Sequence, residues 1–77
     1  MGWRKGQLSG TQNGSNPNFT TPVELESATL AVTNNGVEQE QVTANPGMNQ
    51  YTILGVNITF GYGPKSSDRL RYQGREV

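Results

Sequence analysis

The chemistry open to this chain rests on carboxylates and arginines, because its 77 residues include no histidine and no cysteine. Glutamates form two Glu-x-Glu pairs, Glu24 with Glu26 and Glu38 with Glu40. Alternate residues share one face of a strand, so each pair could bind a cation or move a proton. A hard-cation site needs several oxygen ligands on a tight loop, however, and the expected turns keep the two pairs apart. We therefore expect these glutamates to face solvent and to discourage wrong edge pairing, with no metal and no cofactor bound.

Nucleophile and phosphate-loop motifs are not recognisable in the sequence. No serine lies in a nucleophile turn. Gly55, Gly61 and Gly63 lie within or at the end of an expected strand, whereas the glycines of a phosphate loop precede a helix. We expect them to admit another backbone at close range or to permit a bend. The sequence thus predicts a protein without enzymatic activity, and no motif is specific enough to indicate a family.

Charge is segregated along the chain although the net charge is zero. Residues 1–22 and 65–77 each carry a net charge of +2, and residues 23–64 carry −4. Opposite patches of this kind favour contacts between identical subunits. The charged residues that we expect at such contacts are Arg69, Arg71, Glu38 and Glu40.

Basic and aromatic residues are neighbours at two places, Trp3 before Arg4 and Lys5, and Tyr72 after Arg71. Grooves that bind nucleic acid combine cations with stacking rings in this way. An isoelectric point near 6.1 nevertheless argues against a dedicated nucleic-acid module. We expect protein partners instead.

The elements that position these residues fall into three parts. Residues 1–22 are rich in Gly, Ser, Thr, Asn and Gln and read as an extended arm, because they offer too little apolar area to offset their ordering entropy. Two interpretations stay open: a flexible tail, or an arm that places Trp3 and Phe19 into pockets of a neighbour. Residues 65–77 form a short, polar, basic tail with one helical turn over 68–72.

Residues 23–64 form the body, and the fold class is mostly β: a small antiparallel three-stranded meander. A helix is the alternative for its first segment, which contains good helix formers after a Thr-Pro start. Pro46 and Gly47 predict a type II turn. The expected strands are 23–32, 37–44 and 52–62, with turns at 33–36 and 45–48.

The last of these strands carries large apolar residues on alternate positions, which is the period-2 pattern of a half-buried strand. In the expected register its first half pairs within the chain, while Ile58, Phe60 and Tyr62 extend past the partner strand. Three large apolar side chains without a partner predict an interface. The interface residues are Leu54, Val56, Ile58, Phe60 and Tyr62, with Trp3 and Phe19 on the arm.

A low apolar content limits how much core the chain can form, since only 31% of its residues are hydrophobic. Small scaffolds need disulfides, a metal or oligomerisation, and only oligomerisation remains here. We therefore expect a structural or assembly protein, such as a small component of a virus or phage particle, that binds neighbours by strand addition and arm exchange. The alternative is a small monomeric β-barrel adaptor for peptide or nucleic acid. No signal peptide or membrane-length apolar run is visible, so a virion or the cytoplasm is the expected location.

Overall fold

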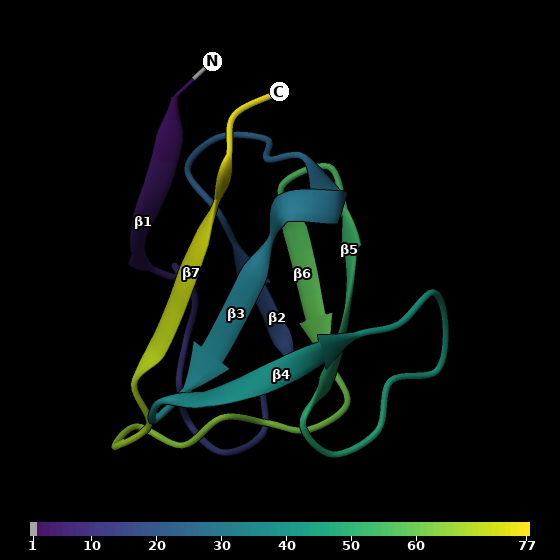
Figure 1. The fold of residues 1–77 in the computed structure, drawn as a ribbon. Helices are drawn as coiled ribbons and strands as arrows, with labels where there is room; N and C mark the ends of the chain where they lie inside the picture. The colour runs from purple at the N-terminus through teal and green to yellow at the C-terminus, as the bar shows by residue number, and fades with distance from the viewer. Residues whose placement is uncertain (1) are drawn as a thin grey trace.

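A computed structural model describes residues 2–77, which form one seven-stranded sheet that curls into a half-barrel (Figure 1). The strand order is β1-β7-β3-β4-β5-β6-β2, and every neighbouring pair is antiparallel except β4 and β5. The elements are β1 (Trp3–Gln7), β2 (Asn18–Thr20), the 3-10 helix η1 (Ser27–Thr29), β3 (Ala31–Asn34), β4 (Val37–Gln41), β5 (Gln50–Leu54), β6 (Asn57–Phe60) and β7 (Leu70–Arg75).

The mostly-β class is confirmed, but the three-stranded meander is wrong. Strands β1 and β2 come from residues 1–22, where we expected an extended arm, and β7 comes from residues 65–77, where we expected a helical turn and a tail. Both segments lie within the sheet: β7 pairs with β1 on one side and with β3 on the other. The N- and C-terminal segments therefore complete the fold of the chain itself.

The expected long strand over 52–62 is two strands joined by a tight turn. Leu54 lies opposite Asn57, so the loop has two residues, and Gly55 begins it with a φ of +63°. Glycine at the first position of a two-residue loop is typical of a type II′ hairpin. The turn changes which residues share a face, because Ile53 now lies opposite Ile58. The overhang predicted from an unbroken strand is therefore wrong.

The hairpin of β3 and β4 is also tighter than expected. Asn35 and Gly36 both take positive φ, at 54° and 85°, as in a type I′ turn. Val32 consequently lies opposite Gln39 rather than Val37. Val37, the first residue of β4, is exposed.

The connection over residues 42–49 is not the predicted type II turn. Asn45 and Asn49 take positive φ there, whereas Gly47 does not. Because β4 and β5 are parallel, the chain leaves the end of β4 in a wide loop before it enters β5 (Figure 1). Parallel neighbours cannot be joined by a tight hairpin.

The first segment of the expected body, residues 23–32, is neither a continuous strand nor an α-helix. It contains η1 and the start of β3, and Leu25 forms an isolated bridge with Glu76. No helix among the described residues is long and apolar enough to cross a membrane.

The core lies inside the curl and is built by alternate residues of most strands. Two glycines allow loops to close over it: a Cβ on Gly61 would meet the carbonyl oxygens of Pro46 and Gly47, and one on Gly63 would meet the backbone of Gly14. The expected close approach at these glycines is thus confirmed. The buried hydrophobic residues are Leu8, Phe19, Leu25, Val32, Tyr51, Ile58, Phe60, Leu70 and Tyr72.

Candidate functional site

The two outermost strands of the sheet, β1 and β2, differ in how their free edges are treated. They meet at one place, where Ser9 and Thr20 exchange backbone hydrogen bonds of 3.0 and 2.9 Å. This bridge closes the curl just beyond the end of β1. The remaining edge of each strand decides what else can pair with the sheet.

The edge of β2 is closed by the chain itself. The backbone N–H and C=O of Asn18 point away from β6, because the hydrogen bonds to β6 are made by residues on either side of it, such as Pro17 and Thr21. The Asn16 amide covers its backbone: Nδ2 donates to the Asn18 carbonyl at 2.9 Å, and the Asn18 N–H donates to Oδ1 at 3.3 Å. Because the backbone of Thr20 is hydrogen-bonded to Ser9, no outward backbone group of Asn18 or Thr20 is left to pair with a new strand.

The edge of β1 is open. Leu8 donates to Leu70, and Glu76 donates to Gly2, so even-numbered residues of the segment form the hydrogen-bonded pairs with β7. In an antiparallel ladder the intervening residues point their N–H and C=O groups the other way. Those residues are Trp3, Lys5 and Gln7. No hydrogen bond within residues 2–77 reaches the outward backbone groups of these three.

The outward side chains beside this edge are mostly basic or amidic. Trp3 lies opposite Arg75, Lys5 opposite Gln73, and Gln7 opposite Arg71, and all six are exposed. Trp3 is 63% exposed. A groove of about 510 Å³ follows this face, and its outward residues are Lys5, Ala31, Thr33, Arg71 and Gln73.

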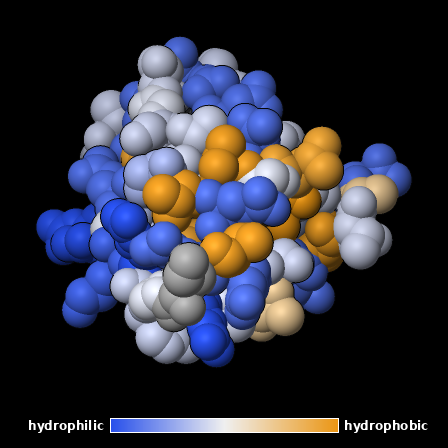
Figure 2. Space-filling view, turned by 90° about the horizontal axis from the view of Figure 1, so that it is seen from above, coloured by the Kyte–Doolittle hydropathy of each residue, from blue (hydrophilic) through white to orange (hydrophobic). Residues whose placement is uncertain are grey.

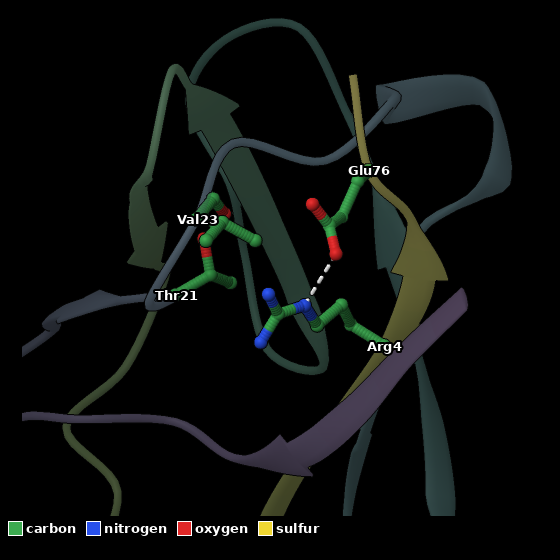
Figure 3. A network of polar contacts seen from close by, with 4 residues as sticks. All are labelled: Arg4, Thr21, Val23 and Glu76. Atoms are coloured by element: carbon green, nitrogen blue, oxygen red, sulfur yellow. Dashed lines mark hydrogen bonds and ion pairs between the residues drawn. The ribbon is translucent and has the colours of Figure 1, made fainter. Parts of the chain in front are cut away.

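One arginine of β1 lies on the other side of the strand and is neutralised. Arg4 donates through Nε to the carboxylate of Glu76, as Figure 3 shows. The hydrogen bond to Glu76 raises the pKa of Arg4. This is the one ion pair among residues 2–77. The cations on the outward face therefore keep their charge unpaired.

The predicted interface residues separate into two groups. Phe19, Ile58 and Phe60 are at most 2% exposed and belong to the core of the chain. Tyr62 is half-buried: its hydroxyl donates to Gln39 Oε1 at 2.6 Å, and burial raises its pKa. These four side chains are occupied within the molecule.

Leu54 and Trp3 are the predicted interface residues that lie on the surface, whereas Val56 is half-buried in the β5–β6 turn. Leu54, 81% exposed, ends β5 at the end of the molecule where both termini lie. Figure 2 looks down on this end and shows apolar residues gathered around it. Val77 is also exposed, whereas Val23 is half-buried against the core.

All four predicted charge contacts are exposed. Arg71 points outward from β7 and Arg69 directly precedes that strand, two residues away on the same side. Glu38 and Glu40 are exposed on β4, as expected of solvent-facing glutamates. No group of three or more potential metal ligands occurs within residues 2–77.

Sequence reasoning missed Lys5, Gln7 and Arg75 as site residues. The signal for Arg75 was available, because Leu70, Tyr72 and Gly74 alternate with three polar residues and so mark a strand with one buried face. The open edge of β1 had no signal, since it depends on which distant strand pairs with it. No family model, curated protein or solved structure matches this chain.

Proposed function

We propose that this chain is a non-enzymatic protein-binding module that accepts an acidic, extended segment of a neighbouring protein on the open edge of β1. The observation that carries the proposal is the row of outward backbone groups at Trp3, Lys5 and Gln7. Five residues of β1 offer an edge about 17 Å long. Strand addition uses such an edge for affinity and the flanking side chains for specificity.

The charge beside the edge selects the partner. Lys5 is the central residue of β1 and lies on the same outward face as Arg71 and Arg75. An antiparallel pairing of two β1 edges centred on Lys5 would place two lysines opposite each other, which is unfavourable. A strand with carboxylates on alternate positions would instead place negative charges beside Lys5, Arg71 and Arg75, which is favourable. The preferred partner is therefore an acidic segment rather than a second copy of β1.

This proposal keeps strand addition from the sequence-based prediction but moves it from residues 54–62 to β1. Arm exchange has less support, because β1 and Phe19 are integrated into the sheet and core of their own chain. An assembly protein and a small adaptor would use the same edge and differ in what supplies the strand. That the protein is a component of a virus or phage particle stays a prediction from the composition of the sequence.

The test is amide hydrogen exchange in the full chain, with and without a synthetic peptide that has glutamate on alternate positions. In the free protein the amides of Arg4, Gly6 and Leu8 should exchange slowly, and those of Lys5 and Gln7 quickly. Peptide binding should slow the second set. A peptide that binds without protecting these amides would disprove strand addition at β1.

Two variants of Lys5 distinguish the contribution of its backbone N–H to peptide binding from that of its side-chain charge. Lys5→Pro removes an outward N–H without removing a bond to β7, so the sheet should persist while peptide affinity falls at least about tenfold. Lys5→Gln removes the charge alone and should give a smaller, salt-dependent loss. Equal affinity of Lys5→Pro and the unmodified chain would contradict the proposal. Sedimentation then distinguishes an adaptor, which stays monomeric, from a self-assembling protein.

A further inference from the structure

A second groove lies at the other end of β7, between the Asn35–Gly36 turn and the loop that precedes the strand. Its volume is about 500 Å³. The residues that line it are Thr33, Asn35, Gly36, Ser67, Arg69 and Arg71. The groove thus combines two guanidinium groups with two hydroxyls, and no aromatic side chain lines it.

The sheet fixes the orientation of these side chains. Thr33 lies directly opposite Arg71, so the two share the outward face of the sheet. Arg69 extends the same alternation by one step, and its carbonyl accepts from the Asn35 N–H at 2.9 Å. The Arg69 N–H donates in turn to Asn35 Oδ1, also at 2.9 Å. The β3–β4 turn and the loop are therefore tied together before any ligand binds.

The nearest carboxylate in the sequence is already engaged. Asp68 accepts from the Lys65 N–H at 2.9 Å, from Asn35 Nδ2 at 3.1 Å and from Asn34 Nδ2 at 3.3 Å. The hydrogen bond from the Lys65 backbone lowers the pKa of Asp68, so it stays ionised and holds the loop. Asp68 does not line the groove. Arg69 and Arg71 are left exposed and outside the one ion pair of residues 2–77.

We propose that this groove is a binding site for a phosphoryl group with two negative charges, such as inorganic phosphate or a phosphate monoester. Guanidinium groups form paired hydrogen bonds with phosphate oxygens, and the hydroxyls of Ser67 and Thr33 can donate to the remaining ones. A carboxylate has only two oxygens for these donors, and a nucleic acid would lack a stacking ring in the groove. This groove shares Thr33 and Arg71 with the groove beside β1, but the inference does not rest on strand addition at β1.

The experiment is a titration of the full chain followed by amide chemical shifts, at constant ionic strength and slightly alkaline pH. Inorganic phosphate, dimethyl phosphate and acetate are the three probes. Phosphate should give saturable shifts centred on Gly36, Ser67 and Arg69, and should bind more tightly than the other two. Equal or tighter binding of dimethyl phosphate would overturn the monoester assignment in favour of a diester, and equal binding of acetate would overturn it in favour of a carboxylate.

Matched variants test the location. Arg71→Gln and Arg69→Gln should each weaken phosphate binding about tenfold or more, because each removes charge-assisted hydrogen bonds. Arg75→Gln is the control, since Arg75 is exposed on the same face of β7 but does not line the groove. It should leave the affinity unchanged. A similar loss in all three variants, or no saturable shift at all, would overturn the site.

Discussion

Phe19 and Phe60 pack edge to face within one chain, with ring centroids 5.7 Å apart and ring planes at 72°. The two residues come from segments 41 positions apart that the pairing of β2 with β6 brings together. Edge-to-face contacts of this kind add to the stabilisation that aromatic burial provides. Side chains that the sequence suggested for a partner therefore stabilise the chain that carries them.

The first prediction concerns Phe60. Phe60→Ala should lower the free energy of unfolding by about 3–5 kcal/mol, because it leaves a cavity beside Phe19 and Tyr51. Urea unfolding of the dilute chain measures the change. Leu54→Ala is the control: Leu54 is 81% exposed, and its truncation should change stability by less than about 0.5 kcal/mol. A larger effect at Leu54 than at Phe60 would contradict the core described here.

The second prediction concerns Gly61. Gly61→Ala would place a Cβ against the Pro46 carbonyl oxygen and should destabilise the fold by about 1–3 kcal/mol or more, since backbone must shift. Gly2→Ala meets no atom within 4 Å and should be close to neutral. Thermal unfolding of the two variants compares them directly. Equal melting temperatures would show that the loop over Gly61 is not packed as described.

The third prediction concerns the Asn16 cap of β2. Asn16→Ala removes the bonds that cover the Asn18 backbone and should cost about 1 kcal/mol. It also uncovers a second free edge, so self-association should increase in sedimentation velocity experiments. Asn13→Ala is the control, because Asn13 bonds only to Ser15 and Asn16 in the preceding turn. Association in the control but not in Asn16→Ala would refute the edge assignment.

The fourth prediction is a loss of stability in alkali. Burial, together with the charge of Glu38, raises the pKa of Tyr51 to about 12 from an ordinary value near 10. The folded chain then holds a proton that the unfolded chain releases, so the contribution of Tyr51 to stability is fully present below about pH 10 and is lost as pH rises through the folded value. Tyr51→Phe should flatten this slope. Urea unfolding across the pH series, with tyrosinate absorbance as the second readout, measures both.

Local patterns in the sequence predicted the strand-rich class and the exposed charges on β4 and before β7. They failed at turns: the shorter β3–β4 loop shifts the pairing by two residues, and the missed turn after Leu54 changes which residues of β5 and β6 share a face. Asn35–Gly36 carried a two-residue hairpin signal that we interpreted as a longer loop. Gly55 was interpreted as a residue within a strand, yet its φ of +63° ends one strand and starts a turn.

The open edge of β1 could not be predicted from local patterns at all. Whether Lys5 points its N–H outward depends on its pairing with β7, some 68 residues along the chain. Nothing in the composition of residues 1–22 distinguishes a strand with such a distant partner from a flexible arm. The alternation of Leu70 and Tyr72 was the one local sign of that partner.

The pairing of β1 with β7 also has a consequence for how the chain reaches its native state. β7 is the last strand and lies between β1 and β3, so β1 has no neighbouring strand and β3 has only β4 until residues 70–75 are available. Contacts between such distant residues slow folding, because loop closure precedes the gain from packing. β1 therefore stays unpaired until β7 has been synthesised, whereas the β3–β4 and β5–β6 hairpins depend only on local pairing.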